Sequence, residues 1–481
     1  METIAGTGQL SETKQRLLAV LLNGEKPARR APSGRIRRNI SGSVPLSLSQ
    51  EEIWRQTLDG INKPPFYNES ITIHRQGPLD VDALQQSLTE IVRRHEIWRT
   101  TFDNVDGQPH QIVHPAPKSF PMSRYDLRAL PESQKEKEAI QLGSEQARQR
   151  FDIRTGPLLR VRLIHLDDAH HRLYLTMHQI IVDGVSVFRV FPVELIKLYE
   201  AFANGRPLPL LEPAIQYRDF ASWQREFLGQ EILERQLKYW RERLGGELPA
   251  LESTRDRQRP PVHTYRGSIV PGEWPSAVAD QLRVVCREQS VSTFMGFLAG
   301  FVVLWHSYTK QDDIIVGTLA PAGREQQEVQ ELLGCFLNPV PLRFRITPNM
   351  TFRDLLYQTR EVLSGAVANE DVPFYRIVEQ ISRSSNPSEN PLFDAVISLA
   401  PSLPDLGPGW DQTFMDVESG GSRWNLYLEL NERPRGVILR TQYNPDLFDV
   451  EMVCRMTNDL RSLLEAGAAE PQKTISELRS K

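Results

Sequence analysis

Residues 176–185 bring together three side chains that can take part in chemistry: His178, Gln179 and Asp183. A histidine exchanges a proton near neutral pH. A glutamine takes up no proton there, but its amide donates and accepts hydrogen bonds, so it can orient an amine or stabilise an oxyanion. An aspartate behind a loop, with arginines available, is more often one half of a structural ion pair. We therefore predict a site that works through hydrogen bonds, with His178 as its candidate base.

The residues just before this stretch predict the element that positions it. Leu173, Leu175 and Met177 alternate with other residues, which is the period of a half-buried strand. Asp183-Gly184 is a turn signal, and we expect Gly184 to permit a backbone conformation or a close approach that a side chain would block. A polar loop that leaves a buried strand is a common place for functional residues.

The stretch resembles the His-His-x-x-x-Asp-Gly signature of the condensation domain of nonribosomal peptide synthetases. With Asp183-Gly184 as the anchor, His178 matches the first histidine, while Gln179 stands at the position of the second. Adjacent residues of a strand point to opposite faces, so His178 is either a buried structural histidine or a displaced base.

Other segments resemble the remaining signatures of this family in the same order. Arg-His-Glu-Ile-Trp-Arg-Thr-Thr-Phe at residues 94–102 differs from the usual pattern by a tryptophan in place of leucine. The further matches are residues 44–54, 216–223, 333–340, 369–374, 390–393, 424–428 and 443–448. The resemblance covers about residues 42–465 and depends on the order of the motifs more than on any one of them.

Composition excludes several classes of function. The 57 basic and 61 acidic residues leave a net charge of −4, which gives no support for binding nucleic acid through bulk charge. No apolar run reaches the roughly 20 residues that span a bilayer, and the N-terminus lacks an apolar signal-peptide core. The three cysteines lie far apart and lack metal-ligand spacing, which favours reduced thiols. We expect a cytoplasmic protein without a metal site, a membrane segment or a nucleic-acid partner.

Breaker-rich segments divide the chain into four parts. We predict an N-terminal helix, capped by Ser11, and a basic linker in residues 1–41, followed by an N-terminal lobe in 42–215. A C-terminal lobe follows in 216–465, and residues 466–481 are predicted to be a linker toward a following domain. Strands are expected at 68–74, 159–163 and 395–399, and helices after Asp80, at 277–289 and at 294–308. A helix after Gly184 should kink or break at Pro192.

The patterning by itself indicates a mixed α/β protein with two cores. The resemblance implies more: two lobes like chloramphenicol acetyltransferase, forming a V-shaped pseudo-dimer with mixed sheets and the signature loop at their junction. It also implies that Asp183 pairs with Arg94, with Arg99 as the second choice. Asn338, Trp223 and Ser398 become candidates for a substrate tunnel, although Asn338 could equally cap a local turn.

The function implied by the resemblance is that of a condensation domain in a nonribosomal peptide synthetase or in a hybrid with a polyketide synthase. Such a domain forms an amide between a donor acyl or peptidyl thioester and an acceptor aminoacyl thioester. Upstream and downstream carrier proteins would present both on phosphopantetheine arms, so this chain would need no cofactor of its own. Adjacent synthase domains, including a downstream adenylation domain, are the expected partners. Because Gln179 is no base, condensation would rely on proximity and orientation. The alternatives are a non-condensing domain that gates or recruits a partner, and one that modifies a carrier-bound residue, for example by dehydration.

Overall fold

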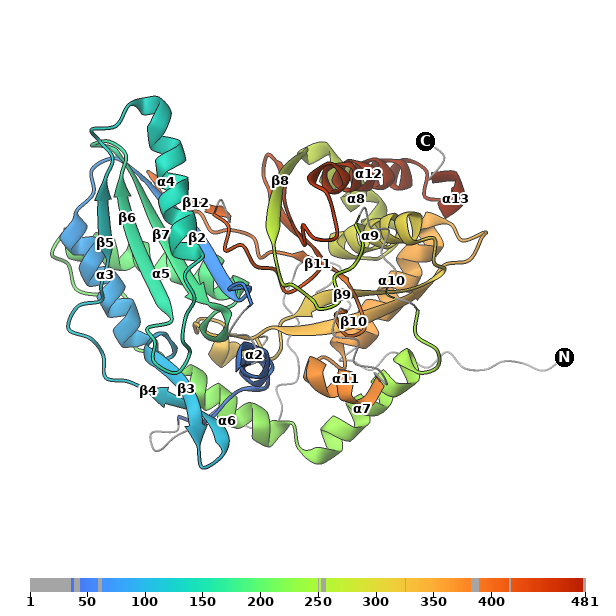
Figure 1. The fold of residues 1–481 in the computed structure, drawn as a ribbon, viewed down its shortest axis with the longest axis horizontal. Helices are drawn as coiled ribbons and strands as arrows, with labels where there is room; N and C mark the ends of the chain where they lie inside the picture. Colours follow the sequence, from blue (N-terminus) through green and yellow to red (C-terminus); the bar gives the residue numbers. More distant parts are fainter. Residues whose placement is uncertain are drawn as a thin grey trace.

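The structure is a computed structural model that describes residues 36–38, 44–58, 63–249, 251, 257–324, 326–381, 389–414 and 417–478. The predicted helix after Ser11 and nearly all of the basic linker lie outside the described residues. Figure 1 shows two lobes that lie side by side, meet in the lower half of the view and diverge above.

The N-terminal lobe contains the elements of roughly the first half of the chain. Its strands are β1 Val44–Pro45, β2 Asn68–Gln76, β3 Thr100–Val105, β4 Gln108–Val113, β5 Ser123–Asp126, β6 Leu159–His165 and β7 His170–His178. Its helices are α2 Leu48–Leu58, α3 Val81–Arg94, α4 Glu132–Ala147, α5 Phe191–Ala203 and α6 Tyr217–Phe227, with short turns at η1 Glu96–Arg99, η2 Gln179–Ile181 and η3 Ser186–Val190. The side chain of Asp80 caps α3 as predicted, accepting hydrogen bonds from two main-chain N–H groups.

Strand β7 is covered on both faces, and not on one as its alternation predicts. Leu173, Leu175 and Met177 lie in the main core of the lobe. Tyr174, on the opposite face, is buried in a smaller cluster together with Leu142 of α4. The outward residues of a strand cannot reveal a helix that covers them from elsewhere in the chain, so this second layer was not predictable from β7 itself.

The expected disturbance at Pro192 takes the form of a wider helical turn. Residues 186–190 form a π-helical segment, closed by the Phe191 N–H donating to the Ser186 carbonyl, and α5 continues directly from it. Pro192 follows directly, so the wider π-helical turn lies where the missing N–H of the proline interrupts the ladder of main-chain hydrogen bonds. The helix therefore changes its winding before the proline and does not break.

The C-terminal lobe contains a second, larger sheet with its own helices. Its strands are β8 Ser268–Pro275, β9 Asp313–Ala320, β10 Asn338–Arg345, β11 Ala395–Leu399, β13 Leu426–Arg433 and β14 Gly436–Tyr443. Its helices are α7 Gln230–Leu244, α8 Ser276–Glu288, α9 Thr293–Thr309, α10 Phe352–Val367, α11 Phe374–Ile381, α12 Val450–Ala469 and α13 Ile475–Leu478, with a turn at η4 Gln327–Val329. The predicted strand 395–399 and the predicted helices after residues 276 and 293 are confirmed.

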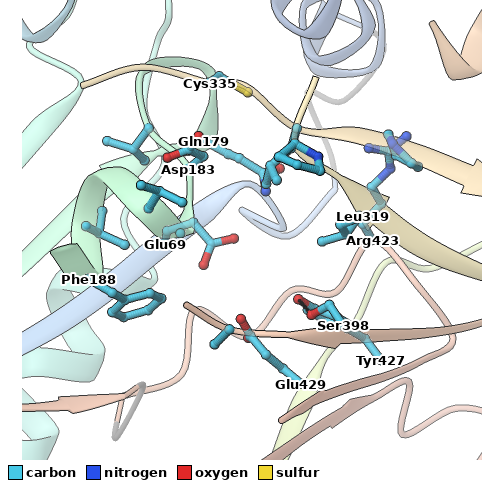
Figure 2. Close-up of a pocket in the computed structure, with 18 of the residues that line it drawn as sticks. Glu69, Gln179, Asp183, Phe188, Leu319, Cys335, Ser398, Arg423, Tyr427 and Glu429 are labelled. Atoms are coloured by element: carbon cyan, nitrogen blue, oxygen red, sulfur yellow. Dashed lines mark hydrogen bonds between the residues drawn. The ribbon is translucent and has the colours of Figure 1, made fainter. Parts of the chain in front are cut away.

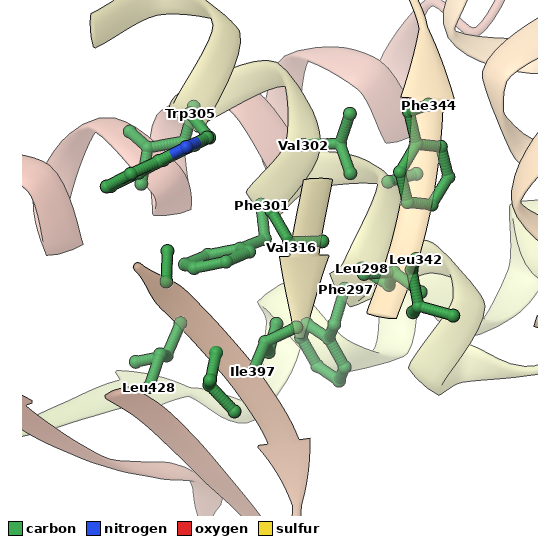
Figure 3. Close-up of a cluster of buried hydrophobic side chains, with 14 of the residues drawn as sticks. Phe297, Leu298, Phe301, Val302, Trp305, Val316, Leu342, Phe344, Ile397 and Leu428 are labelled. Atoms are coloured by element: carbon green, nitrogen blue, oxygen red, sulfur yellow. The ribbon is translucent and has the colours of Figure 1, made fainter. Parts of the chain in front are cut away.

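Both large sheets mix parallel and antiparallel strands. The C-terminal sheet has the order β10-β9-β11-β13-β14-β8, with β11 parallel to β9 and β13. Helix α9 is buried almost throughout, and Phe297 and Phe301 reach toward the sheet residues Val316 and Ile397 (Figure 3). Trp305 stacks on Phe301 one turn further along the helix. Within the described part of the chain no single helix is long and apolar enough to cross a membrane, although α8 and α9, bent by 105°, pass this test as a pair.

Two segments from the second half of the chain lie in the N-terminal lobe and tie the lobes together. The five-stranded N-terminal sheet has the order β12-β2-β7-β6-β5, and its edge strand β12, Trp410–Phe414, comes from the second half of the chain. Residues 329–336 also lie in the N-terminal core through Val329, Leu332 and Phe336. Helix α6 also packs in the N-terminal core, through Tyr217 and Phe220. The predicted boundary between the lobes at 215/216 is wrong for this reason.

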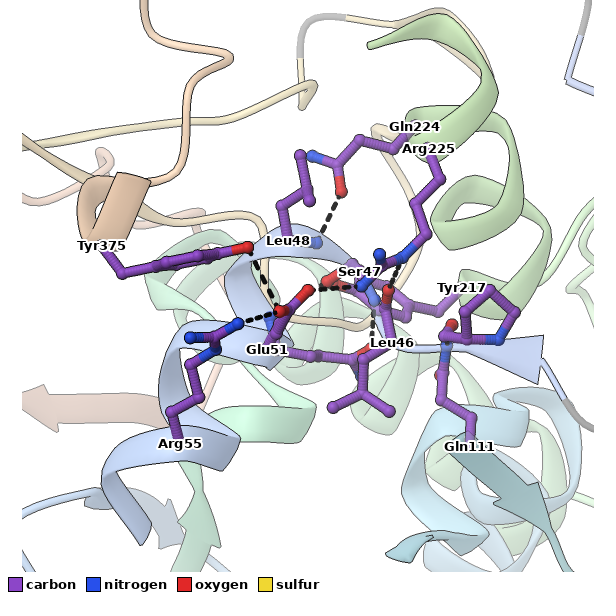
Figure 4. A network of polar contacts seen from close by, with 12 residues as sticks. Leu46, Ser47, Leu48, Glu51, Arg55, Gln111, Tyr217, Gln224, Arg225 and Tyr375 are labelled. Atoms are coloured by element: carbon purple, nitrogen blue, oxygen red, sulfur yellow. Dashed lines mark hydrogen bonds and ion pairs between the residues drawn. The ribbon is translucent and has the colours of Figure 1, made fainter. Parts of the chain in front are cut away.

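A polar network joins α2 to both α6 and the C-terminal lobe (Figure 4). The Glu51 carboxylate accepts hydrogen bonds from Arg55 at 2.8 Å, from Arg225 of α6 at 2.7 Å and from the Tyr375 hydroxyl of α11 at 3.2 Å. This network fixes the helix that lies beside the junction of the lobes.

Residues 466–478, predicted to belong to a linker, are part of the C-terminal lobe. Helix α12 runs to Ala469, and α13 buries Ile475 and Leu478 in the core. The main-chain N–H of Phe352 donates to the Lys473 carbonyl at 3.1 Å, so the segment is tied to the start of α10. Residues 466–478 have only two large apolar side chains, so their hydrophobic pattern was too weak to predict that this segment packs on the lobe.

Candidate functional site

A cavity of about 320 Å³ lies where the two lobes meet, within the range of small-molecule sites. Figure 2 shows side chains of both lobes pointing into it. From the N-terminal lobe the lining includes Glu69, Met177, Gln179, Asp183, Gly184 and Phe188. From the C-terminal lobe it includes Leu319, Cys335, Ser398, Arg423, Tyr427 and Glu429. The predicted position of the signature loop at the junction of the lobes is confirmed.

The end of β7 determines which side chains of the loop reach this cavity. The Gln179 N–H donates to the Tyr67 carbonyl at 2.8 Å, which holds the turn against the start of β2. Ile180 and Ile181 are fully buried in the core. Since its neighbours on both sides are buried, Gln179 alone among residues 178–181 lines the cavity.

The side chain of Gln179 is available to a ligand. Its amide makes no hydrogen bond with any of the residues that the structure describes, although it is only partly exposed. One amide offers two donors and one carbonyl acceptor. It can therefore bind an amine through the carbonyl oxygen or an oxyanion through the NH₂ group.

His178 is a structural residue in this geometry, so its possible role as a displaced base is wrong. It is buried and does not line the cavity, and its Nδ1 accepts the Ile180 N–H at 3.3 Å. Burial lowers the pKa of His178 to about 3, so the ring is neutral near pH 7 and a weak proton acceptor. Tyr67 and Phe151 enclose it, with ring centroids at 5.8 and 6.3 Å.

Asp183 forms the expected structural ion pair, but its partner is Arg324. Both carboxylate oxygens accept from Nη2 of Arg324, at 2.8 and 2.9 Å, and the Ser186 N–H donates to Oδ1 at 2.7 Å. Arg324 also donates to the carbonyls of Val329 and Leu332, at 3.0 and 2.7 Å. The pair thus fastens the signature loop to the segment that crosses from the C-terminal lobe.

The two arginines predicted to pair with Asp183 have other partners. Arg94 lies 3.5 Å from Glu194 and donates to the Leu211 carbonyl at 2.8 Å. Arg99 lies 3.9 Å from Glu96 and donates to the main-chain carbonyl of His114, just after β4. Neither lines the cavity. The prediction that Asp183 pairs with an arginine of the second signature was wrong, because its partner Arg324 lies 141 residues away in the sequence.

Gly184 lines the cavity, but the protein itself does not require a glycine there. Its φ is outside the left-handed region, and an added Cβ would meet Phe188 at 3.7 Å and Pro401 at 3.8 Å, which are ordinary contacts. The predicted need for a special backbone conformation is therefore wrong. Space for a ligand is the remaining reason for a residue without a side chain.

Of the three tunnel candidates, only Ser398 lines the cavity, where its hydroxyl lies 2.8 Å from that of Tyr427. Asn338 is buried elsewhere: its Nδ2 donates to the carbonyls of Glu370 and Val372, at 2.7 Å each, so it holds a turn that lies 32–34 residues away in the sequence and caps no local turn through these bonds. Trp223 stacks on Phe227 along α6, with ring centroids at 5.1 Å. Asn338 and Trp223 were therefore wrongly placed in the tunnel.

Five charged residues that line the cavity were missed from the sequence, namely Glu52, Glu69, Arg423, Glu429 and Arg440. Glu69 shares strand parity with Ile71 and Ile73, which lie in the core. A carboxylate at a core-facing position was a usable signal. Glu429 lies on the face of β13 opposite the core residues Leu428 and Leu430.

Among the described residues no group of three or more histidine, cysteine, aspartate or glutamate side chains is arranged to hold a metal ion. The other charged groups of the cavity wall are paired, as Arg423 is with Glu52 at 2.6 Å. The polar side chains that line the cavity carry amide, hydroxyl, carboxylate, guanidinium and thiol groups.

Comparisons with known proteins identify the family. Residues 40–480 match the model of the Condensation domain. The chain is 34% identical over 439 residues to chondramide synthase cmdD of Chondromyces crocatus, covering 90% of this chain and 11% of that protein. It is 33% identical over 437 residues to phosphinothricin tripeptide synthetase PhsC of Streptomyces viridochromogenes, covering 89% of this chain and 40% of that protein. The chain therefore spans less than half the length of these relatives.

Solved structures share the fold. The X-domain from teicoplanin biosynthesis superposes with a TM-score of 0.80 at 24% identity, over 92% of this chain and 99% of that one. The first condensation domain of the calcium-dependent antibiotic synthetase gives 0.78 at 20% identity, over 91% and 99%. The two lobes thus have the chloramphenicol acetyltransferase-like arrangement. With the family match over nearly its whole length, the chain belongs to the condensation domains of nonribosomal peptide synthetases.

Proposed function

We propose that this domain forms an amide between a donor acyl thioester and an acceptor aminoacyl thioester, each presented on the phosphopantetheine arm of a carrier protein. The observation that carries this proposal is the unpaired Gln179 amide in a cavity between the lobes, at the position of the family's second histidine. Carrier proteins upstream and downstream, and a neighbouring adenylation domain, are the proposed partners. The length of the relatives supports this, because the chain matches only a part of each synthetase.

The geometry supports a mechanism based on positioning. The acceptor nitrogen attacks the thioester carbonyl, and Gln179 binds either the amine or the developing oxyanion. Holding two reactants in register contributes about 7–11 kcal/mol in well-oriented systems. A base contributes a factor of roughly 10²–10⁴, or about 3–5 kcal/mol. A domain without a base at residue 179 therefore keeps the larger contribution, and the proton leaves the nitrogen for another acceptor.

The test is a reaction with two loaded carrier proteins, one acylated and one aminoacylated, with the product read by intact mass. Gln179→Ala should slow amide formation by roughly a hundred- to a thousandfold, the range for losing one oriented hydrogen-bond donor. Gln141→Ala is the matched control, because Gln141 lies exposed on α4 and away from the cavity. The wild-type rate should rise toward pH ~8.5 as the amine, with an unperturbed pKa of about 7.7–8.0, loses its proton.

Two outcomes would count against parts of this proposal. If the wild type forms no amide above the background of the carriers alone, across a panel of loaded acyl and aminoacyl groups, the condensing function is wrong. A gating, partner-recruiting or modifying role would then replace it; one structural relative, the X-domain, forms a complex with OxyB. If Gln179→Ala keeps the wild-type rate, condensation stands and Gln179 has no part in it.

A further inference from the structure

The cavity holds two carboxylates that approach it from opposite lobes. Glu69 extends from β2 and Glu429 from β13, and Figure 2 shows both side chains pointing into the cavity. Glu429 already has a cationic partner, because Arg440 stands directly opposite it on β14 and its Nη1 lies 3.4 Å from the carboxylate. Glu69 has no such partner among the described residues.

Glu69 lies on the same wall as Gln179. It is the cross-strand neighbour of Met177, which also lines the cavity two residues before Gln179. The hydrogen bond from the Gln179 N–H to the Tyr67 carbonyl ties the same two segments together just beyond this pair. The side chains of Glu69 and Gln179 therefore face one ligand space from adjacent strand ends.

The carboxylate of Glu69 makes no hydrogen bond and no ion pair with any residue in the described ranges. An unpartnered carboxylate in an enclosed cavity is costly while it is ionised, so it favours binding a cation or a proton. The charged or titratable groups that face it from the C-terminal lobe are Arg440, Glu429 and Tyr427.

On the remaining wall, the other acidic residues are already neutralised, Glu52 by Arg423 and Asp183 by Arg324. Burial raises the pKa of Glu69, against the opposing effect of Arg440. Burial likewise raises the pKa of Glu429 to about 8, with Arg440 opposing the rise and Glu69 adding to it. The pKa values of Glu69 and Glu429 are therefore both shifted toward the pKa of an α-amine. A general base works best when its pKa lies near the working pH.

We propose that Glu69 is the catalytic proton acceptor of this domain, receiving the proton of the acceptor amine that residue 179 cannot take. This inference rests on the proposed condensing function. The nitrogen forms its bond to the thioester carbonyl carbon, and the carbon–sulfur bond breaks with its electron pair on the donor's sulfur. The proton from nitrogen passes to the Glu69 carboxylate and then to the thiolate, so the products are an amide and a free thiol.

The test is Glu69→Gln, which keeps the size of the side chain and removes its ability to take a proton. Amide formation should fall about a hundredfold or more at saturating carriers, with the KM for the carriers unchanged. The wild-type rate should depend on two ionisations, that of Glu69 and that of the acceptor amine. The variant should follow only the ionisation of the amine itself. Glu273→Gln, on the exposed strand β8, is the matched control and should keep the wild-type rate and pH profile.

A second variant separates a chemical role from a structural one. Glu69→Ala should be inactive, and added formate should restore part of its rate, because a small carboxylate can occupy the vacated space. Both variants should melt at or above the wild-type temperature, since they remove an unpaired carboxylate. An active wild type together with a Glu69→Gln variant of unchanged rate and pH profile would overturn this inference and leave condensation standing. A wild type that forms no amide would overturn both.

Discussion

Asp183→Asn tests whether the signature aspartate acts through the fold or through the chemistry. The substitution keeps an oxygen that can accept the Ser186 N–H and removes only the negative charge. Arg324 would then remain in the interior without a counter-charge, because its side chain is 7% exposed and that of Asp183 only 2%. Its remaining hydrogen-bond partners, the Ser186 hydroxyl and the carbonyls of Val329, Gln330 and Leu332, are neutral.

The expected loss of stability is large. Removing one member of a buried ion pair costs about 3–5 kcal/mol. The entropy of unfolding is about 2.1 cal/mol/K per residue, so in a chain of 481 residues each kcal/mol lowers the melting temperature by roughly 1 °C, and we expect a fall of roughly 3–5 °C. Because the pair joins the signature loop to a segment that crosses between lobes, the loss should accompany a loss of amide formation.

Calorimetry and urea unfolding of the purified domain measure this effect. Asp126→Asn is the matched control: Asp126 and Arg128 also pair, at 2.7 Å, but both are about half exposed, so the melting temperature should not change measurably. Removing both charges, with Asp183→Asn and Arg324→Gln together, should recover part of the loss. An Asp183→Asn protein with wild-type stability and no turnover would refute the structural role and indicate direct participation in the reaction.

Two further predictions concern the neighbours of this residue. Gly184→Ala should leave the free energy of unfolding within about 0.5 kcal/mol of the wild type, yet slow amide formation up to roughly a hundredfold by shifting a substrate, whereas Gly229→Ala should do neither. If Gly184→Ala slows amide formation but also lowers the free energy of unfolding, the inference that Gly184 leaves room for a ligand is wrong. His178 has a folded pKa of about 3 against about 6.5 unfolded, so below pH ~6.5 the unfolded chain binds the extra proton and stability falls by about 1.4 kcal/mol per pH unit. Urea unfolding of His178→Gln between pH 5 and 7 should show a flatter dependence than the wild type, and an equal slope would contradict the buried, neutral histidine.

Local patterns predicted the elements but not their distant partners. The alternation of Leu173, Leu175 and Met177 identified β7, and the apolar run after residue 293 identified α9, because burial against one lobe's core leaves a periodic trace in the sequence. The partner of Asp183 leaves no such trace. Arg324 lies in a loop of the second half of the chain, and only the crossing of residues 329–336 into the N-terminal core brings it near.

The same reasoning explains the other errors at the site. Asn338 and Trp223 lie within family signatures, but a motif shows that a residue matters and does not show which way its side chain points. Glu69 belongs to no signature. Its parity with Ile71 and Ile73 placed it on an inward face, and only the docking of the second lobe shows that this part of the face borders a cavity.

The signature residues differ in what the fold demands of them, and this difference bears on the glutamine. His178 is enclosed and hydrogen-bonded, and Asp183 holds a buried cation across the junction, so a change at either position disturbs folding. The side chain of Gln179 has no partner within the described chain. A substitution there alters the ligand space and little else, so this position can change while the rest of the signature is retained. A base can then act from another strand of the same wall without any change to the scaffold.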